Sequence, residues 1–134
     1  MHFYGIYIHG SIALDAFEEQ ASDIGIVAIT QGESTVEHTL TRFRRARDLL
    51  VRDLAAIRGI DVASPPGAMY VFFRVRGVTD SLAFCKQLVR EARLGLAPGS
   101  AFGPEGDGFV RWCFAASEDR LAEGVHRLRA FLKR

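Results

Sequence analysis

The amino-acid sequence predicts an α+β fold in which a small, mostly antiparallel sheet packs with helices, next to one long helix. The chain has 134 residues, of which 49% are hydrophobic and 25% are charged, as in an ordinary globular domain. One long segment carries a single helical hydrophobic stripe. After it, short apolar runs alternate with amphipathic helical segments, which is the pattern of strands and helices that share one core.

Residues 1–30 give the weakest signals of secondary structure. Residues 1–12 are rich in aromatic and β-branched side chains, which indicates either a weak strand or a loose tail. Residues 13–29 place apolar side chains at helical spacing, so we expect a helix there, although Gly25 weakens it. We therefore divide the chain into an N-terminal segment, residues 1–30, and a main domain, residues 31–134.

Residues 34–58 form the clearest predicted element, a long helix. Ser34 and Glu37 fit a capping box, in which each side chain accepts a hydrogen bond from the other residue's backbone N–H. The apolar stripe consists of Val36, Leu40, Phe43, Leu50, Leu54 and Ile57. Gly59 is placed to end the helix in a left-handed conformation. Such a helix spans about 36 Å, the full width of a domain of this size, so we expect it to back or bridge a domain.

The rest of the chain alternates between short strands and helices. We expect strands at residues 60–63, 68–75, 94–97 and 109–115, and helices that begin at the caps 79–81 and 117–119. Strand 68–75 is apolar on both faces, so we expect it to be central in the sheet or covered on both sides, and strand 109–115 is likewise expected to be buried. Without a large domain, some of this apolar surface is expected to be exposed. Cys85 and Cys113 lie in apolar segments and are expected to be reduced core residues of a cytoplasmic protein.

The charge of the chain argues against several kinds of partner. Lys and Arg number 17 and Asp and Glu number 16, which leaves a net charge of +1. No strong field attracts the chain to nucleic acid or to an anionic membrane. No apolar run approaches the roughly 18 residues of a membrane-spanning helix, and the first residues lack the basic region of a signal peptide. We therefore expect a cytoplasmic location, with no nucleic-acid and no membrane partner.

Arg111 is the strongest candidate for a functional side chain. It shares one face of the predicted strand 109–115 with Phe109 and Cys113. A guanidinium among apolar neighbours needs an anion, and its planar fork suits a carboxylate in bidentate geometry. Two interpretations stay open at this point: a structural ion pair with a carboxylate of another segment, which is the commoner arrangement, or a site for the carboxylate of a ligand.

Other candidates are weaker. Tyr70 either presents its hydroxyl to a ligand or belongs to the core. Residues 99–108 form a glycine-rich loop. Its beginning, at residues 98–103, can bring backbone amides close to a ligand, but it lacks the end of a phosphate-binding P-loop, and a plain turn is the commoner interpretation. The histidines, His2, His9, His38 and His126, show no metal-ligand spacing, and no metalloprotease or serine-hydrolase motif occurs. No metal site is predicted.

Three segments in register resemble a known family. They are PPGAMYVF at residues 65–72, LAPGSAFG at 96–103 and GFVRWCFA at 108–115. In this order and spacing they resemble the C-terminal segment of class I/II pyridoxal-phosphate (PLP) aminotransferases, the aspartate-aminotransferase-like group of fold type I. RFRRARD at residues 42–48 resembles the long interdomain helix of this family, and the resemblance runs from about Gly25 to the C-terminus. It implies the small C-terminal domain of these enzymes, linked by the long helix to a large PLP-binding domain.

The resemblance assigns roles to individual residues. Arg111 matches the family arginine that binds the α-carboxylate of the substrate. Gly67 and Tyr70 match the entry of the strand that borders the substrate site. Residues 99–103 match the loop beside that arginine. The resemblance thus favours the ligand interpretation of Arg111 and implies amino-acid and 2-oxo-acid substrates.

The cofactor chemistry of the family has no counterpart in this sequence. The family holds PLP as a Schiff base on a lysine, with an aspartate on the pyridinium nitrogen. Lys86 and Lys133 match no such motif, so no catalytic and no cofactor-binding residue is assigned. We expect PLP only in a complete enzyme, formed with a missing large domain and assembled as a homodimer.

Two functions of different classes follow. The first is a truncated or split aminotransferase whose C-terminal segment supplies the carboxylate-binding arginine and is not catalytic alone. The second is a stand-alone α+β module that binds an amino or oxo acid, or regulates another protein, because a fold does not fix a function.

Overall fold

The chain forms two compact units, Met1–Thr39 and Leu40–Arg134. The structure, a computed structural model, describes residues 5–9, 25–29 and 33–133. The boundary that the sequence suggests after residue 30 stays a prediction.

The first unit contains a two-stranded antiparallel sheet. Strand β1 (Gly5–His9) pairs with β2 (Gly25–Ile29), so that Gly5 lies opposite Ile29 and His9 lies opposite Gly25. A strand within residues 1–12 is therefore confirmed. The helix expected over residues 13–29 is wrong at β2, where β-branched residues favour an extended backbone once a partner strand is present. The rest of that expected helix lies outside the described residues.

The long helix α1 covers Glu33–Ala55, so it begins one residue earlier and ends three residues earlier than predicted. Ser34 therefore lies inside the first turn. After Ala55 the chain makes a tighter turn than an α-helix, in which the Ile57 N–H donates to the carbonyl of Leu54, three residues earlier, at 2.9 Å. Gly59 has φ +90° and its carbonyl accepts from the Arg76 N–H at 2.8 Å. Gly59 thus forms the turn into the sheet rather than the immediate helix end.

The second unit contains a four-stranded sheet in which every pair of neighbours is antiparallel. The strands are β3 (Ile60–Val62), β4 (Tyr70–Val75), β5 (Ala97–Pro98) and β6 (Phe109–Cys113), in the order β3-β4-β6-β5. Arg111 on β6 lies opposite Phe72 on one side and Ala97 on the other. The predicted α+β class with a small antiparallel sheet is confirmed.

Two further helices complete this unit. Helix α2 (Ser81–Gln87) begins after Asp80, whose side chain accepts from the Ala83 N–H at 2.8 Å, and it continues into a π-helical turn, η2 (Leu88–Ala92). Helix α3 (Glu118–Leu132) follows Ser117. Both predicted helices are confirmed. Leu82 of α2 and Val89 of η2 are exposed, whereas Phe84 of α2 is buried.

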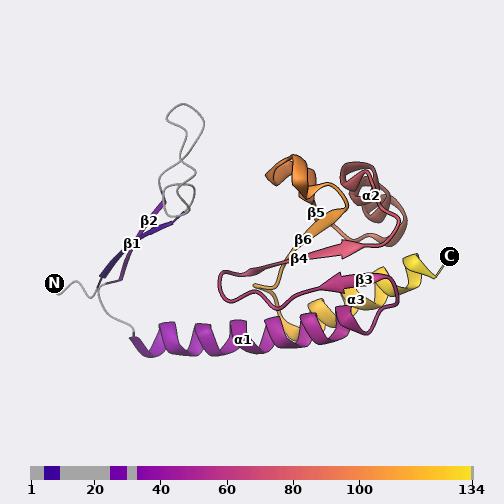
Figure 1. Cartoon of the computed structure of the whole chain (residues 1–134). Coiled ribbons are helices and arrows are strands. Elements are labelled where there is room, and N and C mark those ends of the chain that lie inside the picture. The colour runs from indigo at the N-terminus through magenta and orange to yellow at the C-terminus, as the bar shows by residue number, and fades with distance from the viewer. Residues whose placement is uncertain (1–4, 10–24, 30–32, 134) are drawn as a thin grey trace. The chain divides into compact units, whose positions relative to one another are not determined.

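The core lies on one face of the sheet, between the strands and all three helices. This covered face consists of Val71, Phe73, Val75, Val110, Trp112 and Phe114. Phe114 meets Phe43 of α1 with ring centroids 6.5 Å apart, and Phe84 of α2 meets Phe131 of α3 at 5.9 Å. Figure 1 shows α1 and α3 running below β4 and β6. Among the described residues, the more exposed side chains of β4 and β6 lie on the opposite face.

Among the described residues, the other face of β4 and β6 is only partly covered. This open face consists of Tyr70, Phe72, Arg74, Phe109, Arg111 and Cys113. The exposed fraction of Phe72 is 40%, against 0% for its neighbour Phe73. Strand β4 is central in the sheet, as predicted, and apolar surface on its second face is exposed, as expected for the chain without a large domain. Cys85 is buried as predicted, whereas the expectation of a core position is wrong for Cys113, which is exposed.

Candidate functional site

Arg111 lies at the centre of the open face. It is the middle residue of β6 and is flanked by strands on both sides. Its guanidinium carbon lies 3.9 Å from the ring centroid of Phe102 and 4.2 Å from that of Tyr70. We call Tyr70 and Phe102 the aromatic pair. Phe102 in turn meets Phe72 edge to face at 5.5 Å. Two segments far apart in the sequence thus meet at one guanidinium.

The guanidinium of Arg111 has no carboxylate partner among the described residues. The ion pairs there involve Arg47, Arg52 and Arg127. Within that part of the chain, the structural ion pair left open by the sequence is not found. Contact with an aromatic ring uses the flat face of a guanidinium and leaves the N–H groups at its edge unbonded. The aromatic pair therefore restrains Arg111 while its donors stay available to an anion.

The glycine-rich loop brings one side chain to Arg111, and three of its backbone amides are used within the protein. It forms two 3-10 turns, η3 (Gly99–Phe102) and η4 (Pro104–Gly106). The N–H groups of Ser100, Gly106 and Asp107 all donate within the protein, at 3.1, 3.0 and 3.4 Å. These three amides are therefore not available to a ligand. Phe102, which the sequence analysis did not single out, is the loop residue that reaches Arg111; no periodic pattern marks it.

Gly67 takes no part in the contacts that join Arg111 to Tyr70 and Phe102. It lies with Pro66 and Ala68 in the segment before β4, where they line a cavity of about 150 Å³. The other lining residues are Leu40, Phe43, Arg44 and Arg47 of α1, together with Phe114. Of the three predicted site residues, Arg111 and Tyr70 are in contact with each other, and Gly67 lines the cavity instead.

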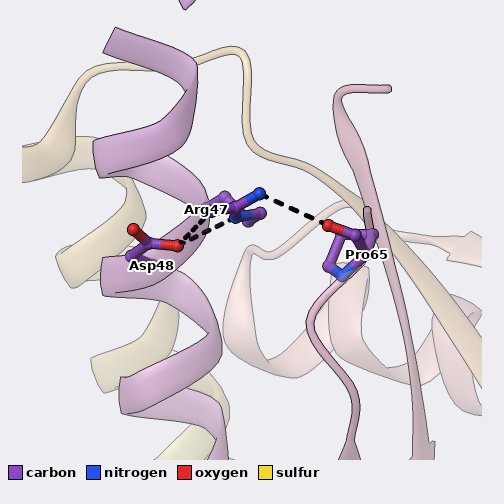
Figure 2. Close-up of polar contacts among 3 residues, drawn as sticks. All are labelled: Arg47, Asp48 and Pro65. Atoms are coloured by element: carbon purple, nitrogen blue, oxygen red, sulfur yellow. Dashed lines mark hydrogen bonds and ion pairs between the residues drawn. The ribbon is translucent and has the colours of Figure 1, made fainter. Parts of the chain in front are cut away.

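Arg47 links α1 to this segment. Its Nε and one terminal nitrogen each lie 2.8 Å from Oδ1 of Asp48, and Nη1 donates to the Pro65 carbonyl at 3.5 Å, the long limit of a hydrogen bond (Figure 2). The exposed fraction of the Arg47 side chain is 26%. Arg47 thus connects α1 to the segment before β4.

The comparisons with known proteins agree on one family. The chain is 35% identical to an aspartate aminotransferase of Pyrococcus horikoshii over 130 residues, which cover 95% of this chain and 32% of that protein. It is 41% identical to an aspartate aminotransferase of Thermotoga maritima over 90 residues, or 67% of this chain and 22% of that protein. The crystal structure of an aromatic aminotransferase from P. horikoshii matches 75% of this chain and 27% of its own, with a TM-score of 0.71 and 36% identity. No family model matches the chain.

The α+β unit with its small antiparallel sheet matches the fold of these aminotransferases. The chain belongs to the aspartate-aminotransferase-like, fold-type I aminotransferases, and it corresponds to their C-terminal segment. It spans about a third or less of the length of the curated relatives it matches.

The described residues do not fit the PLP that this family uses. A Schiff base needs a lysine in the site. Lys86 is exposed on α2, and Lys133 is exposed beyond the end of α3, next to Arg58 and Arg129. Neither lies on the open face. In the same part of the chain, no three His, Cys, Asp or Glu side chains come together as metal ligands, and no helix there is long and apolar enough to cross a membrane.

Proposed function

We propose that this chain is the C-terminal, substrate-binding segment of a PLP-dependent aminotransferase, which moves an amino group from an amino acid to a 2-oxo acid. In this proposal Arg111 binds the α-carboxylate of the substrate. The observation that carries it is the restrained guanidinium of Arg111, which has no protein anion among the described residues and lies in an open apolar face.

The geometry suits a carboxylate. A carboxylate binds a guanidinium edge through two parallel N–H···O bonds, and charge-assisted bonds of this kind contribute about 1.5–3 kcal/mol each. The rings of Tyr70 and Phe102 lie against the guanidinium, so less rotamer freedom is lost when the ligand binds. Tyr70 thereby acts as an orienting residue, and a role for Gly67 at the border of the site rests on the family match.

The remaining parts of the reaction come from outside the described residues. PLP, when bound, supplies the electron sink for amino transfer. Its lysine and its other contacts are assigned to a large domain, and the complete enzyme is expected to be a homodimer. The stand-alone binding module left open by the sequence needs no such domain. Relatives about three times as long as this chain favour the segment over the module.

A hybrid enzyme tests the role of Arg111. The C-terminal segment of the T. maritima relative is replaced by the matching segment of this chain, and kcat/KM is measured for amino-acid donors. Arg111→Ala is expected to lower kcat/KM at least about 100-fold, equivalent to about 2.7 kcal/mol, whereas Arg111→Lys retains part of the activity.

Arg74 gives a matched control on the same face. Its guanidinium carbon lies 5.4 Å from the ring centroid of Phe109, so Arg74→Ala also removes a stacked arginine. This variant is expected to stay within about threefold of the parent hybrid. Equal losses for the two variants, or a soluble, PLP-loaded hybrid with no activity, would contradict the proposal.

A further inference from the structure

We propose that Asp107, Ser81 and Ser100 are positioning residues for Arg111, acting through Phe102. We call these three residues the serine–aspartate network. The inference rests on the proposed function only for what the network is for, which is to hold Arg111 ready for a carboxylate. The network and its contacts are properties of the fold. None of the three side chains contacts the guanidinium; what they hold is the turn that carries Phe102.

The hydroxyl of Ser81 is the centre of the network. Ser81 is fully buried, and its Oγ lies 3.0 Å from Oδ1 of Asp107, 3.0 Å from Oγ of Ser100 and 3.1 Å from the Ser100 nitrogen. A hydroxyl has one proton and two lone pairs, and a carboxylate only accepts. Ser81 therefore donates to Asp107 and accepts from both the N–H and the O–H of Ser100. Every hydrogen-bonding position of this buried hydroxyl is filled.

The network joins both ends of the glycine-rich loop to the start of α2. The Ser81 N–H, at the first position of the helix, also donates to Oδ1 of Asp107 at 3.3 Å. The Ala83 N–H donates instead to Asp80, the helix cap. Two aspartates thus serve the same helix start, but only Asp107 comes from the loop. Ser100 connects the beginning of the loop to this point, and Asp107 connects its end.

Little backbone freedom remains between these two anchors. A Cβ on Gly99 would overlap the carbonyl oxygen of Gly106, and a Cβ on Gly106 would overlap that of Gly99, so the two turns touch backbone to backbone. Ser100 and Phe102 belong to the same 3-10 turn. A turn fixed at Ser100 therefore fixes the direction in which Phe102 leaves the backbone.

Phe102 needs this support because its ring lies on the surface. Its exposed fraction is 47%, and its ring contacts are with Phe72 and Arg111. A half-exposed ring on an unanchored loop moves away from its partners readily. With the network intact, the ring stays over the guanidinium and keeps it in the position to which a carboxylate can bind.

The test is a spectrum of the side-chain Nε–Hε group of Arg111 in the ¹⁵N-labelled full chain, assigned by its disappearance in Arg111→Lys. Rings stacked on a guanidinium shift this signal away from that of free arginine. We expect Asp107→Ala and Ser81→Ala to lose most of the shift that Phe102→Ala loses. Asp107→Asn keeps an acceptor oxygen and is expected to retain most of it.

Asp80→Ala is the matched control. It removes a hydrogen bond from the same helix start but no contact with the loop, so it is expected to leave the Arg111 signal in place. The proposal is overturned if Asp80→Ala moves the signal as much as Asp107→Ala, because the network would then only stabilise the fold. It is also overturned if Asp107→Ala and Ser81→Ala leave the signal unmoved while Phe102→Ala moves it.

The spectrum requires no ligand, so the two proposals can fail separately. If the signal responds as expected but Arg111→Ala leaves kcat/KM of the hybrid enzyme unchanged, positioning stands and the proposed function fails. If Arg111→Ala abolishes activity while Asp107→Ala changes neither the signal nor KM, the function stands and positioning fails. Where both hold, Asp107→Ala is expected to raise KM for the amino acid about tenfold, and Asp80→Ala to leave it near that of the parent.

Discussion

The covered face and the open face of the sheet are built from alternating residues of the same two strands, yet they differ in almost every property. Phe73 and Trp112 are buried in the core, whereas the adjacent residues Phe72 and Arg111 are exposed and half-buried, respectively. Both faces are largely apolar. Apolar composition alone therefore does not identify a core. One face stabilises the fold, and the other presents a cation among aromatic rings.

The largest expected effect separates the two phenylalanines. Phe73→Ala is expected to lower the free energy of unfolding by about 3–5 kcal/mol, because it leaves a cavity in a fully buried position. Phe72→Ala, on the open face, is expected to cost about 1 kcal/mol or less. Urea unfolding of the purified chain, followed by circular dichroism, measures both.

A marginally stable domain can unfold altogether on loss of Phe73. Phe73→Leu then serves as the smaller change, with a cost of about 1–1.5 kcal/mol. An equal loss of free energy of unfolding for the variants at positions 72 and 73 would show that both faces are packed in solution. The distinction between an open and a covered face would then be wrong.

The reactivity of the two cysteines measures the difference in exposure between the open face and the core. Cys113 is exposed on the open face, whereas Cys85 is a buried residue of α2, where burial raises the pKa of its thiol. Labelling with iodoacetamide at mildly alkaline pH is expected to be about tenfold or more faster at Cys113, because Cys85 reacts only after local opening. In Cys113→Ser the fast phase should vanish. A fast phase that persists in this variant contradicts the assignment.

The raised pKa of Cys85 also has a consequence for stability. Between the thiol pKa of the unfolded chain and that of the folded chain, the folded chain holds a proton that the unfolded chain has lost. The free energy of unfolding therefore falls as the pH rises through this interval, and the contribution is fully present below it. Cys85→Ala should remove this alkaline component, whereas Cys113→Ser should retain it.

The sequence predicts the alternation of residues but not which side of the sheet is open. That Phe109, Arg111 and Cys113 share a face follows from the period of a strand, and the structure confirms it. Whether a layer covers that face depends on where the helices lie, which no local pattern contains. The expected helix at Gly25–Ile29 failed for a similar reason, since its pairing with Gly5–His9 is non-local.

The supporting residues of the site are harder to find in a sequence. Phe102 reaches Arg111 across nine positions from a loop without periodicity, and Ser81 meets Asp107 across 26. Contacts between residues so far apart in the sequence produce no periodic pattern that could reveal them. Arg111 itself was found because a charge on an apolar strand violates the local pattern, and such violations concentrate at functional sites.

The smallest expected effect concerns Arg111 itself. Replacing Arg111 by Leu removes contacts with two exposed rings, each worth about 0.5–1 kcal/mol, and supplies an apolar side chain that packs on the same rings. These changes largely offset each other, so urea unfolding should place Arg111→Leu within about 1 kcal/mol of the parent chain. A loss of more than about 2 kcal/mol would instead indicate a structural ion pair, because an unpaired carboxylate would be left behind. A side chain proposed to bind the substrate, yet expected to be nearly neutral for folding, would distinguish the open face from the covered one.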